Sequence, residues 1–250
     1  MKVITLSKEE IYGGSLLLVN AQHPLRNQEA ITLASVDSRF PDIQMESHAA
    51  DILRLILTYI SSEDEIVPVS GYRSLEEQTA IFEDSLKENG ETFTRQFVAL
   101  PGHSEHQTGL AIDLGLNQEE IDFICPEFPF EGICNTFRKT APDYGLIQRY
   151  GKDKENITGI SHEPWHFRYV GYPHSRIITD RNFALEEYIE WLKGYREDNR
   201  YVFGCVDECD IEIFYVFADR DELSVSLPEH VKYQVSGNNV DGFIVTVWRA

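Results

Sequence analysis

Two short stretches of the sequence gather side chains of the kinds that bind metals. GHSEHQTGLAIDLG carries His106 and Asp113, and SHEPWHFRYVG carries Glu163 and His166. A histidine and an aspartate in one stretch would by themselves fit a hydrogen-bonded structural pair. Two imidazoles and one carboxylate, however, make up the three-ligand set of a catalytic zinc, which keeps a fourth position open for water. Such a zinc lowers the pKa of its bound water to about 7, so the two stretches together predict hydrolysis at neutral pH.

Glu163 is the candidate base for that water. Pro164 follows it and removes a backbone donor, which disfavours the helix interior that the HExxH motif of a zincin requires. An extended or turning segment is favoured instead, in which Glu163 and His166 approach one point. Glu163 lies beside a ligand without being needed as one, so it is free to hold the water and take its proton.

Arg73, in the stretch SGYRS, is the candidate for stabilising an oxyanion. Attack on a carbonyl creates negative charge that a fixed cation or hydrogen-bond donor must meet. Arg73 follows a predicted strand and precedes a predicted helix, a common place for a functional side chain at a cleft. The alternative is a solvated cation at the end of a strand.

The elements that position these residues are indicated by hydrophobic periodicity. In GLAIDLG the residues alternate, so Leu110, Ile112 and Leu114 face the core, while Asp113 shares the other face with small residues. The stretch after Glu163 alternates in the same way. His106 precedes the first of these strands by a turn and can fold back over the open face.

Further elements are expected on both sides of these strands. A short buried strand is predicted within residues 14–25, a helix over 46–62, and a strand over 65–72 in which Pro68 indicates an edge or an end. Ser74 and Glu77 form a capping box that opens a helix closing at Gly90. Short helices are expected at 118–125 and 131–141, and an amphipathic helix at 181–198.

The end of the chain has a different character. YVFGCV, IEIFYVFA, VKYQVS and FIVTVW are strand-like, and the last two flank GNNVDG, a hairpin signal. The predicted organisation is therefore a catalytic domain over residues 1–199 and a small β-rich appendage over 200–250. The fold class predicted is α+β, with a central antiparallel sheet flanked by helices that form a zinc cleft.

Composition restricts the partners. The 250 residues carry a formal net charge of −20, which repels phosphate backbones and anionic lipid surfaces, so neither nucleic acid nor a membrane is an expected partner. No signal peptide or apolar run long enough to span a bilayer is evident, which predicts a cytoplasmic protein with reduced cysteines. A metal at the Cys205/Cys209 pair would need two more ligands nearby.

With these residues assembled, the chain resembles the VanY/VanX-type D-alanyl-D-alanine metallopeptidases, and most of all their bifunctional VanXY subgroup. The resemblance covers roughly residues 12–172 and runs through LLLVNAQHPL, SGYRSLEEQ, SEHQTGLAID and YGLIQRYGKDKENITGISHEPWHFRYVG. The SxHxxGxAxD and ExxH elements occur in the family's order.

The resemblance implies roles for seven residues. Zinc would be held by His106, Asp113 and His166, with Glu163 as the base and Arg73 facing the scissile carbonyl. Two further residues match substrate-contacting positions, Gln78 and Ser104, and the Ser104 hydroxyl could reach a terminal carboxylate; for Gln78, surface solvation is an equal alternative.

Other polar and aromatic residues near the motifs are expected to have lesser roles. His103 and Glu105 are expected to be solvated or to support the ligands, and His162 to lie outside the site. Trp165 is expected to pack the cleft wall and Tyr150 to be structural.

The activity implied is hydrolysis of peptides ending in D-Ala-D-Ala, both the free dipeptide and the cytoplasmic UDP-linked pentapeptide, and hence glycopeptide (vancomycin) resistance. Two alternatives stay open: a D,D-carboxypeptidase only, or a lysin-type peptidoglycan endopeptidase with the appendage as a wall-binding module. A non-catalytic zinc module is disfavoured, because both Glu163 and Arg73 are present. The appendage could cap the cleft, stabilise the last helix or form the surface of a homodimer.

Overall fold

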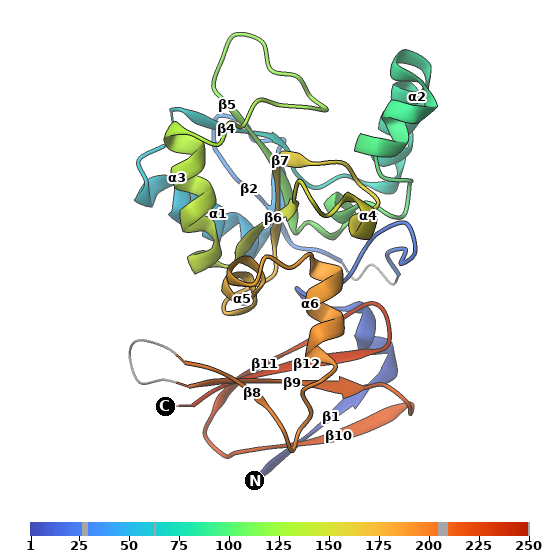
Figure 1. Ribbon diagram of the computed structural model, residues 1–250, viewed down its shortest axis with the longest axis vertical. Coiled ribbons are helices and arrows are strands. Elements are labelled where there is room, and N and C mark those ends of the chain that lie inside the picture. The colour runs from blue at the N-terminus through green and yellow to red at the C-terminus, as the bar shows by residue number, and fades with distance from the viewer. Residues whose placement is uncertain (27–29, 63, 205–209, 250) are drawn as a thin grey trace. The chain divides into compact units, whose positions relative to one another are not determined.

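The computed structural model describes residues 1–26, 30–62, 64–204 and 210–249 (Figure 1). The Cys205/Cys209 pair lies outside them. The chain divides into two compact units, one formed by Val19–Ala184 and the other by Met1–Leu18 together with Leu185–Ala250. Within the described residues, no helix has both the length and the apolar character needed to cross a membrane.

The Val19–Ala184 unit is built on an antiparallel sheet in the order β4-β5-β7-β6. Its strands are β4 (Ile66–Ser70), β5 (Ala111–Leu116), β6 (Leu146–Tyr150) and β7 (Glu163–Tyr169). A separate two-stranded sheet pairs β2 (Leu33–Ser35) with β3 (Gln44–Glu46). Five helices are described in this unit: α1 (Ser47–Tyr59), α2 (Leu75–Phe97), α3 (Gly132–Thr140), α4 (Glu155–Thr158) and α5 (His174–Asp180). The predicted α+β class with a central antiparallel sheet is confirmed.

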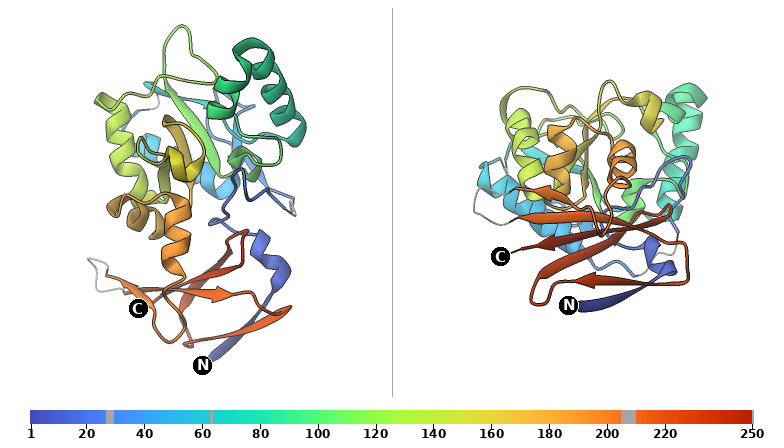
Figure 2. Two further views of the ribbon diagram at one scale, coloured as in Figure 1. Left: turned by 45° about the vertical axis from the view of Figure 1, so that its right-hand side comes forward. Right: turned by 60° about the horizontal axis from the view of Figure 1, so that its bottom comes forward.

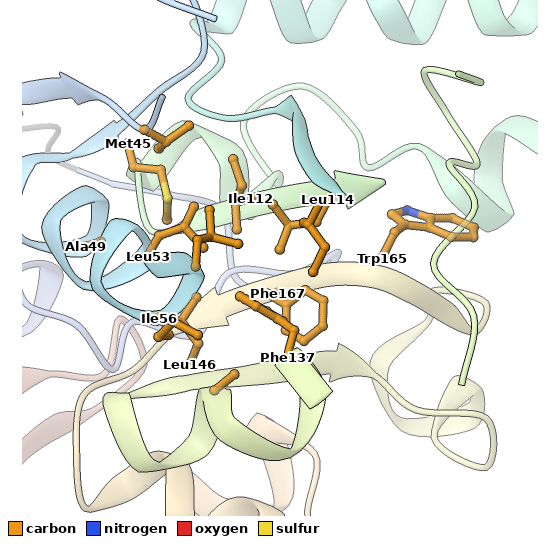
Figure 3. Packing of buried hydrophobic residues seen from close by; sticks show 14 of the residues in the cluster. Met45, Ala49, Leu53, Ile56, Ile112, Leu114, Phe137, Leu146, Trp165 and Phe167 are labelled. Atoms are coloured by element: carbon orange, nitrogen blue, oxygen red, sulfur yellow. The ribbon is translucent and has the colours of Figure 1, made fainter. Parts of the chain in front are cut away.

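The core of this unit lies on one face of its sheet. Ile112 and Leu114 of β5 meet the apolar stripe of α1, and Phe137 of α3 packs against Phe167 of β7 at a ring distance of 4.9 Å (Figure 3). Full burial of one such side chain contributes roughly 1.5–3 kcal/mol. The alternation predicted for β5 is therefore confirmed, and its other face is left for polar residues.

Several predicted elements agree with the structure and several do not. β4 is an edge strand, as Pro68 indicated, and the capping box of Ser74 and Glu77 opens α2. That helix does not close at Gly90; the backbone leaves helical geometry there and the helix resumes to Phe97. The strand predicted within residues 14–25 and the helix predicted at 118–125 are wrong. Leu16–Val19 are buried as expected but run without strand pairing, and 118–125 forms bends.

The second unit contains a sheet in the order β11-β12-β9-β8 and a pair formed by β1 and β10. Its strands are β1 (Lys2–Ser7), β8 (Tyr201–Phe203), β9 (Ile211–Phe217), β10 (Glu222–Leu227), β11 (Lys232–Gly237) and β12 (Gly242–Trp248), and its α-helix is α6 (Leu185–Leu192). The predicted hairpin is present. Asn238 Oδ1 accepts hydrogen bonds from the backbone N–H groups of Val240, Asp241 and Gly242 in its turn.

The division between the units differs from the predicted boundary between residues 199 and 200. β1 pairs antiparallel with β10 along its whole length, which joins the first residues of the chain to the last strands (Figure 2). Leu6 and Ile11 therefore belong to the same core as Phe214 and Val245. A separate role for residues 200–250 stays a prediction.

Candidate active site

Strand pairing brings two of the predicted ligands together. β5 and β7 are antiparallel neighbours, and Asp113 is the direct cross-strand partner of His166. Residues opposite each other on adjacent strands point to the same face of a sheet. The Nδ1 atom of His166 consequently lies 2.9 Å from Oδ1 of Asp113, with both side chains almost fully buried.

A turn brings the third residue to the same face. His106 lies in a 3₁₀ helix, η2 (Glu105–Thr108), which ends at Gly109 with a φ of +70°. That left-handed conformation is readily adopted by glycine and lets the chain reverse into β5. Nε2 of His106 then lies 3.1 Å from Oδ2 of Asp113.

The hydrogen bonds of the two imidazoles leave one nitrogen of each directed at Asp113. Nδ1 of His106 lies 2.7 Å from the carbonyl oxygen of Gly71, to which it can only donate, so Nε2 keeps its lone pair. Nε2 of His166 faces the Glu105 carboxylate at 3.5 Å, which leaves Nδ1 for a metal. One ligand atom from each of His106, Asp113 and His166 lies within 4.8 Å of the others. Two nitrogens and a carboxylate oxygen at this spacing fit a zinc-type ion.

The charge states of the histidines suit a metal as well. Burial lowers the pKa of His106 to about 4, so its ring is neutral at pH 7. Burial would also lower the pKa of His166, but its hydrogen bonds to Asp113 and Glu105 outweigh that effect and raise the pKa to about 9. A cation at Nδ1 would displace this proton, since metal binding requires the neutral ring.

Glu163 lies next to this trio without belonging to it. It begins β7, and its Oε2 is 3.8 Å from Nδ1 of His166. Burial raises the pKa of Glu163 to about 8. Its position beside the three side chains suits proton abstraction from a water in the site.

Arg73 is held at the site rather than at the surface. Its Nη2 donates to Oδ2 of Asp113 at 3.0 Å and its Nε donates to Oγ of Ser70 at 2.8 Å. Its guanidinium also lies 5.5 Å from the ring of Phe123. The alternative of a solvated strand-end cation is excluded, because the Arg73 side chain is only 13% exposed.

The two residues expected to contact substrate lie in different places. Ser104 is buried and lines the site. Gln78 is fully buried, which excludes the alternative that it is solvated at the surface. It does not line the hollow either. Its amide nitrogen donates to the carbonyl oxygen of Ala99 at 2.8 Å, and its Oε1 accepts from Arg73 Nη1 at 3.4 Å. Gln78 thus supports Arg73.

The candidate site residues other than Gln78 line a common hollow that is open to solvent. Trp165 forms part of its wall and packs near Phe97, as predicted. Tyr150, expected to be structural, also lines it, with its ring 4.9 Å from that of His166. His162 does not line it and stacks on Phe130.

The sequence did not predict the contacts of Glu105, whose buried carboxylate lies next to His166. Glu105 accepts from Nε of Arg149 at 2.8 Å and forms an ion pair with Nη1 of Arg168 at 2.9 Å, and all three side chains are 0% exposed. The signal in the sequence was the position of Arg168, two residues after His166 in β7 and so on the same face of that strand.

Comparison with known proteins agrees with this geometry. A family model described as VanY, D-alanyl-D-alanine carboxypeptidase, matches residues 42–172, which include every candidate site residue. The chain is 47% identical over 180 residues to the bifunctional D-Ala-D-Ala dipeptidase and D-Ala-D-Ala carboxypeptidase VanXYC of Enterococcus gallinarum. That match covers 71% of this chain and 95% of that protein.

Solved structures give the same relationship. The vancomycin resistance D,D-dipeptidase VanXYg, crystallised in complex with a D-Ala-D-Ala phosphinate analog, is 61% identical, with a TM-score of 0.97 over 99% of both chains. A mutant of the D,D-pentapeptidase VanY from a VanB-type cassette, in complex with Zn(II), is 28% identical, with a TM-score of 0.57 over 70% of this chain and 98% of that one. The predicted resemblance is confirmed: the chain belongs to the VanY family of D-alanyl-D-alanine carboxypeptidases.

Proposed function

We propose that this chain is a zinc-dependent D,D-peptidase that hydrolyses the D-Ala-D-Ala dipeptide and removes the terminal D-Ala of pentapeptide precursors of peptidoglycan. The observation that carries the proposal is the convergence of His106, Asp113 and His166 beside Glu163 in one hollow. The names of VanXYC and VanXYg support the substrate class, and the Zn(II) complex of VanY supports the metal.

Each side chain has a distinct task in the proposed mechanism. When zinc is bound by His106, Asp113 and His166, it supplies a water of lowered pKa and polarises the scissile carbonyl. Glu163 takes the proton of the attacking water and later delivers it to the departing amine, so one carboxylate serves both halves of the reaction.

Two other side chains stabilise and orient the substrate. Arg73 donates to the oxygen of the carbonyl as negative charge develops on it, in a buried site where such a contact is strong. The hydroxyl of Ser104 donates a hydrogen bond to the terminal carboxylate of the substrate. This contact fixes the position of the peptide relative to Glu163. Destroying both dipeptide and pentapeptide ends would remove the target of vancomycin, and this is the basis of the proposed resistance.

An amino-acid release assay tests the proposal. The purified protein is offered the dipeptide, the UDP-linked pentapeptide and intact cell wall in separate reactions, each with and without a chelator. We expect D-Ala from the first two substrates and none in the presence of chelator. Release from the pentapeptide alone would establish the carboxypeptidase alternative. Cleavage of the wall alone would establish the endopeptidase, and full activity with chelator would refute the zinc mechanism. The cytoplasmic location and the homodimer stay predictions.

A further inference from the structure

We infer that Glu105, clamped by Arg149 and Arg168, is a positioning residue that fixes the metal-binding nitrogen of His166. The inference rests on the proposed zinc site and adds to it a buried support that lies behind the ligand. Glu105 precedes His106 in the chain, yet its carboxylate contacts the other histidine, 61 residues away in sequence.

The two ring nitrogens of His166 face different carboxylates. Nδ1 faces Asp113 at 2.9 Å and Glu163 at 3.8 Å, where the metal is proposed to bind. Nε2 faces Oε2 of Glu105 at 3.5 Å. A neutral imidazole carries one N–H, and an ionised carboxylate can only accept it, so the Glu105 side selects the tautomer with the proton on Nε2. The lone pair on Nδ1 is thereby directed at the metal.

Glu105 can select the tautomer only while its carboxylate is held in place. Its Oε1 meets Nε of Arg149 from β6 and Nη1 of Arg168 from β7, so two guanidiniums anchored on neighbouring strands hold one oxygen. The other oxygen is left to accept from His166.

Neither arginine has access to the substrate. Glu105 and His166 line the hollow, but Arg149 and Arg168 do not. Both contact Glu105, so the contribution to catalysis that we infer for them passes through the ring of His166. Partners of this kind, which bond the far nitrogen of a metal-binding histidine, typically contribute 10- to 100-fold to metal affinity.

Glu105→Gln tests the inference, because it keeps the shape of the side chain and removes its charge. The dissociation constant for zinc is measured by competition with a chromophoric chelator. We expect it to rise by about 10- to 100-fold. The visible absorption spectrum of the cobalt(II)-substituted protein is the second measurement; we expect it to change, since it reports the geometry of the ligating nitrogens. Loss of fold stability alone would lower the melting temperature and leave that spectrum as it is.

Two further variants complete the experiment. Glu105→Asp keeps the charge between the arginines, so it preserves the fold, but it shortens the reach to Nε2 of His166 and is expected to weaken zinc binding as well. Glu212→Gln is the matched control, because Glu212 also bridges two arginines, Arg200 at 2.9 Å and Arg249 at 2.6 Å, in the other unit of the chain. It is expected to bind zinc like the parent.

The possible results separate this inference from the proposed function. If the parent protein binds no zinc, the proposed function itself fails. If the parent binds zinc and folded Glu105→Gln or Glu105→Asp binds it equally tightly, with an unchanged cobalt spectrum, the positioning role of Glu105 is refuted. Should Glu105→Gln fail to fold, the Glu105→Asp measurement decides.

Discussion

At the scale of single residues, Glu163 and His166 have different proposed tasks although they belong to the same strand. They are three residues apart in β7, and only His166 belongs to the group that could hold a metal. Removing Glu163 should therefore separate catalysis from metal binding, whereas removing a ligand should abolish both. This difference allows the two roles to be tested independently.

We predict that Glu163→Ala keeps its zinc and loses turnover by a factor of about 10² or more, as expected for the loss of a general base. The measurements are kcat for D-Ala release and the zinc content by elemental analysis. Glu163→Gln, which retains the shape but not the basicity, should be as inactive. Cleavage of D-Ala-D-Ala at the parental rate by either variant would remove Glu163 from the mechanism.

We predict the opposite pattern for His106, a proposed ligand of the metal. His106→Ala should lose zinc during dialysis, because only Asp113 and His166 would remain to bind it. His103→Ala is the matched control: that histidine lies three positions away, and its Nδ1 contacts the carbonyl oxygen of Asn20 at 2.7 Å. The control should keep its metal, and an equal zinc content in both variants would exclude His106 from the ligand set.

At the scale of elements, the site depends on the turn between η2 and β5. Gly109 adopts a φ of +70°, and its carbonyl oxygen accepts from the N–H of Glu46 at 2.8 Å. A Cβ at this position would lie 3.1 Å from that nitrogen. Glycine is therefore favoured in this turn both by its positive φ and by the close approach of Glu46. The turn lies between His106 and Asp113 in the chain.

We predict that Gly109→Ala destabilises the protein more than Gly132→Ala. Both glycines have positive φ, which costs alanine roughly 1–2 kcal/mol, but a Cβ on Gly132 would meet nothing within 4 Å. Each kcal/mol corresponds to about 2–4 °C in melting temperature for a chain of this size. Thermal melting should therefore show the larger decrease for Gly109→Ala, with a loss of zinc affinity that Gly132→Ala does not share. Equal decreases would mean that the contacts with Glu46 do not matter.

The sequence predicted the elements whose pattern is local and failed where distant contacts decide. The alternation in β5, the edge position indicated by Pro68 and the capping box of Ser74 are short-range signals, and all three were confirmed. The run Leu16–Val19 is as apolar as a buried strand and is buried, but it does not belong to any strand of the described residues. The pairing of β1 with β10 spans more than 200 residues, and no periodicity within either strand could reveal it.

The same reasoning applies to the residues of the site. The convergence of His106, Asp113 and His166 followed from residue types and from a recognisable motif order. The burial of Gln78 behind Arg73 and the contacts of Glu105 with Arg149 depend on how separate elements pack, so the sequence left several alternatives open for them. Ligand sets are thus easier to predict than the side chains that support them.

At the scale of the whole molecule, each of the two units contains a hydrophobic core of its own. The Val19–Ala184 unit contains every residue proposed to act in catalysis. VanXYC matches 71% of this chain across 95% of its own length, so a relative named for both activities is only slightly longer than the matched region. The proposed chemistry accordingly depends on side chains of the Val19–Ala184 unit.

We predict that a chain of residues 19–184 folds and binds zinc, whereas a chain of residues 1–199 aggregates. Removing only 200–250 deprives β1 of its partner β10 and exposes Leu6 and Ile11, which lie in the core with Phe214. An unpaired strand edge with exposed apolar residues favours aggregation. Size-exclusion chromatography and zinc content of the two truncated proteins provide the measurement. A monodisperse, zinc-binding 1–199 fragment would show that the first 18 residues do not depend on the last strands, and the boundary predicted at residue 200 would then describe how the protein folds.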